Sequence, residues 1–514
     1  MNVTTVPGAD SGMYIDGDWV ASADTRPVVN PADESVIANV PEAGPADAEQ
    51  ALEAARRAQP AWARASGIER GVALRRIASA IRERQEDLAR LVVAEQGKTI
   101  TEARGEIAGT AGFFDYYASY ERGQVGTMFA PDEPDEQIQI RSVPHGVVAA
   151  ITPWNFPAAI FARKVAPAIM AGNAIVLKPH EDTPLSALAL AGIIGEVGVP
   201  AGLVNVVTGA GSSVGDALVR HPLSQMVTVT GSVRAGRQIM AAAAETITPV
   251  SLELGGKAPF IVLEDADVAT AVQHAVEARF WNCGQVCTCN ERTYVHRSIH
   301  DEFVARFVEA AAALRVGDPM REDVQIGPKV NETELVKVEE LVKGALDQGA
   351  SLALGGARMK GEEFARGFWF QPTVLTGATN EMDIVQRELF GPVLPVQAFD
   401  DFDEVIALAN DSAYGLTAYV YTADLRRAMR AIDEIDCGEV YVNKIGPEQV
   451  QGFHTGHGLS GLGGDDGVYG YERYLRRKTV YLRWDEATVG SREATSPRPA
   501  AVHPGGGSSA SGGR

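Results

Sequence analysis

Three of the chain's four cysteines lie in one segment, residues 280–292. They are Cys283, Cys287 and Cys289. Gly284 and Gln285 stand shortly before Cys287, and a small flexible residue there lets a substrate come close to the sulfur. Upstream, the carboxylate of Glu253 ends an apolar strand and enters a glycine turn. A thiol and a carboxylate delivered by separate elements make a nucleophile and a base, so the pattern predicts nucleophilic thiol catalysis.

Two other interpretations of the cysteines compete with this one. A metal cluster would need a different arrangement, because C-x3-C-x-C is not a usual zinc spacing and no histidine stands at ligand spacing. We therefore expect no metal. The cysteines could also be ordinary buried thiols, since free cysteine is among the most buried residue types. We expect that packing role for Cys283 and Cys289, and the chemistry at Cys287.

The composition restricts the location and the partners. A chain of 514 residues is long enough for two or three domains with a sizeable core. Its net charge of −21, from 67 acidic and 46 basic residues, disfavours nucleic acid and anionic membranes as partners. So few cysteines indicate a reducing compartment. We find neither a signal-peptide pattern nor an apolar run that could span a bilayer, and we expect a cytoplasmic protein.

Hydrophobic patterns predict the elements that position these residues. Residues 14–20 predict a β-hairpin with Asp16 and Gly17 at its turn. Over residues 46–120, apolar side chains recur at three- and four-residue spacing and predict helices. Further on, short apolar strands are separated by helices. The strands are predicted at 147–151, 174–177, 204–207 and 226–229. Strands without polar alternation are buried on both faces, as in a parallel, doubly wound α/β sheet.

Polar and glycine-rich segments follow these strands, where ligands of such sheets bind. Residues 152–155 follow the first strand, Lys178 and Glu181 the second, and Gly231 and Ser232 the fourth. We expect Gly231 and Ser232, at a helix N-terminus, to hold a phosphate through backbone N–H groups. Lys178 and Glu181 are placed to hydrogen-bond ribose hydroxyls. The sheet is therefore predicted to bind a nucleotide.

The change of pattern along the chain predicts its domains. The expected boundaries are 14–130 and 145–254 for the nucleotide-binding domain, 255–460 for an α/β catalytic domain, 131–144 and 471–483 for oligomerisation strands, and 485–514 for a disordered tail. The strand segments alternate like exposed edges, which tend to be covered by another subunit. The tail is rich in Ser, Pro, Gly and Ala.

Six motifs in this order resemble the NAD(P)-dependent aldehyde dehydrogenase superfamily, over about residues 14–482. They are PWNFP at 153–157, KP at 178–179, GS at 231–232, ELGGK at 253–257, GQVC at 284–287 and ELFGP at 388–392. The resemblance implies a Rossmann-like cofactor domain, an α/β catalytic domain and a small β oligomerisation element. It also implies a homodimer or a homotetramer.

The resemblance implies a role for each site residue. Cys287 attacks the aldehyde carbon, and the Asn155 side chain with the Cys287 backbone N–H holds the oxyanion. Hydride passes to NAD, and Glu253 activates the water that hydrolyses the thioester. The implied cofactor contacts are Thr152, Trp154, Lys178, Glu181, Gly231, Ser232, Leu254, Glu388 at the nicotinamide ribose, and Phe390 near the ring. Because a carboxylate at Glu181 repels a 2′-phosphate, we expect NAD rather than NADP.

The chain also resembles the bacterial lactaldehyde and glycolaldehyde dehydrogenases of this superfamily. It shares their Cys287-x-Cys289 doublet, FARK at 161–164, and QGFH at 451–454 after a nearby glutamate. A short 2-hydroxyaldehyde is therefore the expected substrate. The implied substrate contacts are Arg163, Thr288, Glu448 and His454. Thr288 departs from the pattern, which usually has Asn there.

Three alternatives remain open from the sequence. A semialdehyde with a distal carboxylate would use Arg163 as an anion clamp. A non-catalytic structural protein on the same fold would not need Cys287, Glu253 and Asn155. An aldehyde dehydrogenase that transfers the acyl group to coenzyme A needs no hydrolytic base, so Glu253 favours the hydrolysing kind.

Overall fold

The computed structural model describes residues 12–123 and 125–484. They fall into two units, which we describe separately. The first comprises the described residues up to Gly123 together with Val143–Arg476, and the second those within Gln124–Ser142 and Arg477–Arg514. Among the described residues, no helix is both long and apolar enough to cross a membrane.

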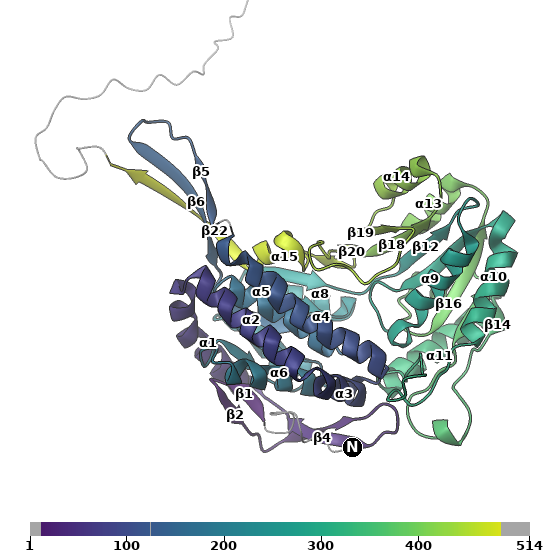
Figure 1. The fold of residues 1–514 in the computed structure, drawn as a ribbon, viewed down its shortest axis with the longest axis horizontal. Coiled ribbons are helices and arrows are strands. Elements are labelled where there is room, and N and C mark those ends of the chain that lie inside the picture. Colours follow the sequence, from purple (N-terminus) through teal and green to yellow (C-terminus); the bar gives the residue numbers. More distant parts are fainter. Residues whose placement is uncertain (1–11, 124, 485–514) are drawn as a thin grey trace, which may run out of the picture. The chain divides into compact units, whose positions relative to one another are not determined.

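An eight-stranded sheet in the first unit contains the strands predicted to bind a nucleotide (Figure 1). Its order is β2-β1-β9-β8-β7-β10-β11-β21. The strands are β1 (Met13–Ile15), β2 (Asp18–Val20), β7 (Val147–Ile151), β8 (Ala174–Lys178), β9 (Val204–Val206), β10 (Met226–Thr230), β11 (Val250–Glu253) and β21 (Gly461–Leu462). Strands β9, β8, β7, β10 and β11 run parallel, so their carboxyl ends lie at one edge.

Helices from the N-terminal half pack around this sheet. They are α1 (Pro45–Arg64), α2 (Gly67–Glu83), α3 (Gln85–Gln96), α4 (Ile100–Ala118), α5 (Pro157–Met170), α6 (Leu185–Glu196), α7 (Asp216–Arg220) and α8 (Val233–Ala244). Reciprocal side-chain caps at Ser66 and Thr99 fix where α2 and α4 begin. Gly97 ends α3 in the left-handed conformation, with φ of 92°. Figure 1 shows α2, α4 and α5 side by side.

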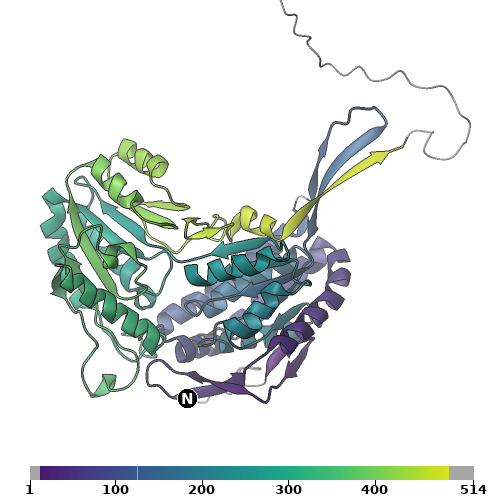
Figure 2. The same cartoon turned by 180° about the vertical axis from the view of Figure 1, so that it is seen from behind.

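A seven-stranded sheet forms the rest of the first unit's core, in the order β14-β15-β16-β13-β12-β18-β19. Its strands are β12 (Ala258–Val262), β13 (Asn290–His296), β14 (Ser351–Leu354), β15 (Thr373–Thr376), β16 (Val393–Phe399), β18 (Thr417–Tyr421) and β19 (Glu439–Val442). The helices around it, green in Figure 2, are α9 (Val268–Phe280), α10 (Arg297–Ala312), α11 (Glu332–Asp347), α12 (Asp383–Gln386), α13 (Phe402–Asn410) and α14 (Leu425–Glu434). Cys287 lies between α9 and β13.

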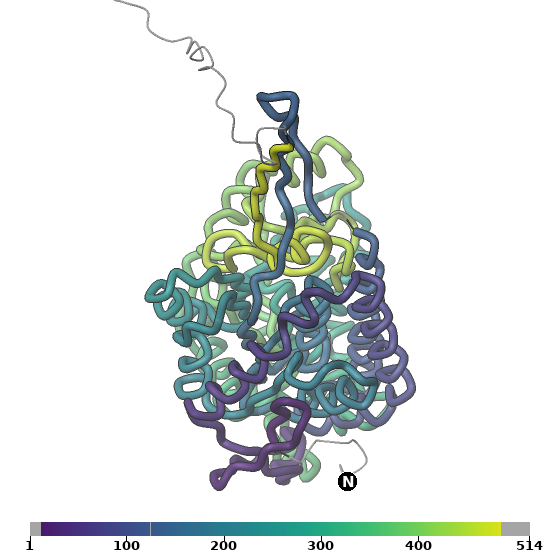
Figure 3. The backbone as a smooth tube through the Cα atoms, turned by 90° about the vertical axis from the view of Figure 1, so that its left-hand side faces the viewer, coloured from purple at the N-terminus to yellow at the C-terminus, as the bar shows by residue number. Residues whose placement is uncertain are grey.

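The chain then returns from the second sheet to the first, and Figure 3 lets this path be followed from green to yellow. Strand β17 (Tyr414–Gly415) pairs with β20 (His457–Gly458), and β21 pairs with β11 at Glu253. Helix α15 (Gly467–Arg473) follows. This return brings the loop that contains Glu448 and His454 to the strand end that carries Glu253.

The second unit is a three-stranded sheet in the order β22-β6-β5. Its strands are β5 (Gly126–Phe129), β6 (Glu136–Pro144) and β22 (Leu475–Arg483). Met128, Phe129 and Tyr481 are exposed on it. A separate hairpin of β3 (Thr25–Val29) and β4 (Val36–Pro41) belongs to the first unit.

Most elements predicted from the sequence are present. The hairpin at 14–20 is confirmed, as are the four buried parallel strands, although the third ends at Val206. The boundary predicted at residue 130 separates β5 from β6, whereas the structure pairs these strands as a hairpin. The segment predicted at 471–483 begins inside α15, and its strand starts at Leu475. The tail predicted at 485–514 lies outside the described residues.

Candidate active site

The carboxyl edge of the eight-stranded sheet gathers site residues that are far apart in the sequence. Asn155 follows β7, Lys178 ends β8, Ser232 follows β10 and Glu253 ends β11. Because these strands are parallel, their ends meet at one edge, the usual place for ligands of such sheets.

A cavity of about 1020 Å³ extends along this edge. All the residues predicted to contact the cofactor line it, together with Cys287 and Asn155. The cofactor residues are Thr152, Trp154, Lys178, Glu181, Gly231, Ser232, Leu254, Glu388 and Phe390. Within the described part of the chain, the buried Thr230 Oγ1 of this wall has no hydrogen-bond partner, and a Cβ on Gly231 would meet open space. The cavity therefore has the room and the free polar group that a dinucleotide requires.

Glu181 is oriented at the cavity by Gly211 and Lys178. Its Oε1 accepts a hydrogen bond from the Gly211 N–H at 2.6 Å and lies 3.5 Å from Lys178 Nζ. Burial opposes ionisation, but Lys178 and His180 outweigh it and lower the pKa of Glu181. Glu181 therefore presents a negative charge near neutral pH.

Glu388 and Phe390 come from the loop that precedes β16. Glu388 Oε1 accepts a hydrogen bond from the Gly256 N–H at 3.0 Å, and a Cβ on Gly255 would collide with this carboxylate. Burial raises the pKa of Glu388 to about 7, and a neighbouring glutamate adds to the effect. Phe390 has a φ of 57°, and its ring meets Trp154 edge-on at a centroid distance of 5.3 Å.

The loop before Cys287 is tied to Asn155. Asn282 has a φ of 50°, and its side-chain amide donates to the Asn155 carbonyl at 2.9 Å. The Asn155 side-chain amide donates to the Gln285 carbonyl at 3.0 Å. These bonds hold the Asn155 amide beside the backbone that leads into Cys287.

Glu253 is a buried carboxylate with unused hydrogen-bonding capacity. Among the described residues, neither of its oxygens has a hydrogen-bond partner. Burial is the main cause that raises the pKa of Glu253 to about 8. Its Oε2 lies 3.5 Å from Nε2 of His454. A carboxylate with this pKa can accept a proton from water near neutral pH.

The four predicted substrate residues lie in different surroundings. Arg163 forms ion pairs with Glu448 and, at 2.9 Å, with Asp466. Burial opposes ionisation of Glu448, yet Arg163 lowers the pKa of Glu448 to about 2. His454 is buried, and its Nε2 lies 3.5 Å from Oε2 of Glu253. None of the four lines the large cavity.

Thr288 is the predicted substrate residue that the sequence pattern least supported. It is buried, and its carbonyl accepts a hydrogen bond from the Tyr419 hydroxyl at 2.6 Å. This bond fixes the backbone immediately after Cys287.

Two carboxylates that were not predicted from the sequence lie beside the predicted substrate residues. Asp466 pairs with Arg163, and Glu439 Oε1 lies 3.1 Å from Nδ1 of His454. Asp466 stands in a glycine-rich loop, and Glu439 opens a short strand. The acidic side chain at each position was the local feature that could have pointed to a role in the site. No pattern of neighbouring residues links Asp466 to Arg163 or Glu439 to His454.

Cys283 and Cys289 differ from Cys287 in exposure. Both are buried, and burial raises the pKa of each thiol to about 12. The Cys289 thiol donates to the Ala278 carbonyl. Their thiols therefore stay protonated at neutral pH. In the described parts of the chain, no three His, Cys, Asp or Glu side chains are placed to hold a metal ion.

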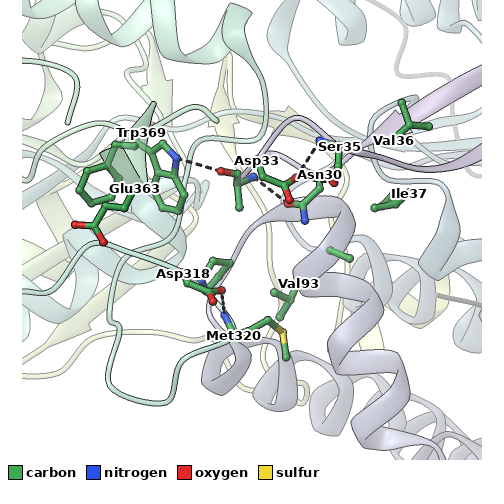
Figure 4. A pocket seen from close by; sticks show the side chains of 14 residues that line it. Asn30, Asp33, Ser35, Val36, Ile37, Val93, Asp318, Met320, Glu363 and Trp369 are labelled. Carbon is green, nitrogen blue, oxygen red and sulfur yellow. Dashed lines mark hydrogen bonds between the residues drawn. The ribbon is translucent and has the colours of Figure 1, made fainter. Parts of the chain in front are cut away.

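A second cavity, of about 510 Å³, contains none of the predicted site residues (Figure 4). Its polar groups largely serve turns. Asp33 accepts from the Ser35 backbone N–H at 2.9 Å, Asp318 accepts from Met320 at 2.9 Å, and the Trp369 indole donates to the Ala32 carbonyl at 3.2 Å. No cysteine lines it, so it lacks the thiol that the predicted chemistry needs.

Known proteins resemble the chain over nearly its whole length. Residues 19–480 match the aldehyde dehydrogenase family. A 3,6-anhydro-alpha-L-galactose dehydrogenase of Streptomyces coelicolor is 54% identical over 93% of this chain and 97% of the relative. The lactaldehyde dehydrogenase of Escherichia coli is 46% identical over 92% of this chain and 98% of the relative.

A solved structure supports the same assignment. The structure of 3,6-anhydro-L-galactose dehydrogenase in complex with NAP superposes with a TM-score of 0.91, at 48% identity, and covers 92% of this chain and 100% of that chain. The predicted fold is therefore confirmed, and a non-catalytic role is set aside. The chain belongs to the aldehyde dehydrogenase family, whose members use NAD(P) to oxidise aldehydes to acids.

Proposed function

We propose that this enzyme oxidises a short 2-hydroxyaldehyde to its acid with NAD, through a thioester on Cys287. The carrying observation is that Cys287 and Asn155 line the cavity that fits a dinucleotide, and that Leu254 and Gly255, which directly follow Glu253, line the same cavity. Cofactor, nucleophile and base then share one site.

The residues divide the reaction between them. The Cys287 sulfur bonds to the aldehyde carbon, and the carbonyl oxygen becomes an oxyanion that the Asn155 amide and the Cys287 N–H stabilise. Hydride acceptance is the chemistry that the bound dinucleotide supplies. Glu253 then takes a proton from water, whose oxygen attacks the thioester, and the carboxylic acid and the Cys287 thiolate are released.

The surroundings of Arg163 favour a hydroxyaldehyde over a semialdehyde. Two carboxylates, Glu448 and Asp466, already pair with the guanidinium. A substrate carboxylate would have to displace one of them. Arg163 Nε and Asp466 Oδ1 are buried without a hydrogen-bond partner in the described residues, whereas Asp466 Oδ2 takes part in the ion pair with Arg163. Such groups suit a small polar substrate, because buried polar atoms normally find partners. Both aldehydes named for the reported relatives, lactaldehyde and 3,6-anhydrogalactose, carry a hydroxyl next to the aldehyde carbon.

Replacing Glu448 with glutamine is expected to shift the preference towards semialdehydes. The change keeps the shape of the side chain but removes one of the two charges that occupy Arg163. The ratio of kcat/KM for succinate semialdehyde to that for lactaldehyde should rise by about tenfold or more. Glu434→Gln, at a surface ion pair with Arg430, is the matched control. Unmodified enzyme should prefer lactaldehyde to both propanal and succinate semialdehyde, and the reverse order would exclude the hydroxyaldehyde.

NAD is the proposed cofactor because Glu181 is an oriented anion, and a carboxylate that receives a ribose 2′-hydroxyl repels a 2′-phosphate. The 3,6-anhydro-L-galactose dehydrogenase structure contains NAP, which is NADP, and by analogy it would favour NADP for this enzyme. We expect a higher kcat/KM with NAD than with NADP, and a fall of the NAD-to-NADP ratio of about tenfold in Glu181→Gln. Asp182→Asn, which removes the adjacent carboxylate outside the cavity, should leave the ratio unchanged. A higher kcat/KM with NADP in the unmodified enzyme would contradict the proposal.

Assembly and location stay predictions. Exposed apolar side chains on the second unit, including Phe129 and Tyr481, support a homodimer or homotetramer. A monomer in light scattering would contradict it. We keep the cytoplasm as the expected location, with no nucleic acid or membrane partner.

A further inference from the structure

The loop at residues 388–392 is bound through its backbone to one buried carboxylate, that of Glu291 on β13. Its Oε2 accepts a hydrogen bond from the Leu389 N–H at 2.8 Å, and its Oε1 accepts one from the Phe390 N–H at 2.7 Å. Glu291 is only 2% exposed. The residues on either side of Leu389, which are Glu388 and Phe390, both line the large cavity. The carboxylate therefore fixes the backbone between two predicted cofactor contacts.

Phe390 has a backbone conformation that needs such support. Its φ of 57° lies in the left-handed region, which a bulky residue adopts only where its surroundings impose it. Its N–H donates to Glu291, and its carbonyl accepts a hydrogen bond from Lys329 Nζ. Both backbone polar groups of Phe390 are thus bound to buried side chains. In this conformation its ring meets Trp154 at the cavity wall.

Lys257, the last residue of the ELGGK motif, is the counter-ion of Glu291. Its Nζ donates to Glu291 Oε2 at 2.8 Å, and both side chains are buried. Arg279 lies 3.9 Å from the other oxygen. Burial opposes ionisation of Glu291, but Lys257 and Arg279 outweigh it and lower the pKa of Glu291. An ionised carboxylate has two acceptor oxygens, so it can bind both N–H groups of the loop at once.

We propose that Glu291 is a positioning residue for the dinucleotide. By binding the Leu389 and Phe390 N–H groups, it keeps the Glu388 carboxylate and the Phe390 ring on the cavity wall. Lys257 keeps Glu291 charged and does not itself line the cavity. The inference rests on the proposed cofactor contacts of Glu388 and Phe390, but it holds for NAD and NADP alike and for any aldehyde.

Glu291→Gln tests this role, because a glutamine has a single oxygen and can accept from only one of the two N–H groups. The dissociation constant for NAD, measured by titration of protein fluorescence, should rise by about tenfold or more, since a hydrogen bond to a charged group is lost. Hydrolysis of p-nitrophenyl acetate by the cofactor-free enzyme should keep at least about half of its rate, because this activated ester can acylate Cys287 without hydride transfer. General misfolding would lower both.

A double variant separates the binding of the loop from the ion pair. Lys257→Met combined with Glu291→Gln removes both charges, a replacement that buried ion pairs often tolerate. The raised dissociation constant should persist in this variant. A return to the value of the unmodified enzyme would mean that Glu291 serves only to neutralise Lys257, which overturns the inference. If Glu291→Gln alone fails to fold, the double variant gives the same decision.

Glu95→Gln is the matched control. Glu95 is also a buried carboxylate that accepts from two successive backbone N–H groups, those of Leu185 at 2.7 Å and Ser186 at 3.0 Å, but it lies outside the cavity. Its replacement should leave the dissociation constant for NAD unchanged.

Phe390→Ala tests the contact on which the inference rests. A raised constant in Phe390→Ala with an unchanged one in Glu291→Gln overturns the role of Glu291 alone. An unchanged constant in Phe390→Ala would instead refute the proposed cofactor contact, and the inference with it.

Discussion

Replacing Cys287 with alanine is expected to abolish aldehyde oxidation while the fold and dinucleotide binding persist. The cofactor residues and Asn155 remain, but no atom is left to form the covalent bond to the aldehyde carbon. We expect kcat to fall by at least about a thousandfold, since oxyanion contacts without a nucleophile retain little catalysis. Cys287 is only partly buried, so the loss of its sulfur leaves no enclosed core cavity.

Two measurements check this result. Stopped-flow detection of NADH should show no burst, and titration of protein fluorescence with NAD should give an unchanged dissociation constant. Cys289→Ala is the matched control, because this thiol is buried and bonded to the Ala278 carbonyl. That variant should lose some stability but keep the burst. If Cys289→Ala removes the burst and Cys287→Ala keeps it, the nucleophile has been assigned to the wrong cysteine.

Local patterns sufficed to predict the parallel strands and the residues at their ends. Lys178 and Glu253 end buried strands, and parallel strands fix where those ends meet. The order of the strands did not have to be known. The same reasoning led to Gly231 and Ser232, because a glycine turn before a helix can be recognised from neighbouring residues alone.

The contacts around His454 could not be predicted in that way. Glu439 and Glu253 reach this imidazole from β19 and β11, which belong to different sheets. Arg163 was predicted as a substrate contact, but no sequence pattern indicated that Glu448 and Asp466 would occupy its guanidinium. Side-chain charges come together here through the return of the chain at β20 and β21, which no short pattern encodes.

The raised pKa of Glu253 predicts how the rate depends on pH. At pH 7 a carboxyl with a pKa of about 8 is roughly one-tenth ionised, and only the ionised form can take a proton from water. Hydrolysis of the acyl-enzyme should therefore become faster from pH 6 to about pH 8 and level off above it. The NADH burst precedes hydrolysis and should lack this dependence.

Replacing Glu253 with glutamine should remove that pH dependence and stop the reaction after hydride transfer. Glutamine fills the same buried space but cannot accept the proton of water, so steady-state turnover should fall by about a hundredfold or more. One equivalent of NADH should still form in a burst, and mass spectrometry of the quenched protein should find the acyl group on Cys287. Glu434→Gln, at a surface ion pair, is the control and should retain turnover. If the burst itself is slowed in Glu253→Gln and no acyl-enzyme accumulates, Glu253 is the base of the thiol.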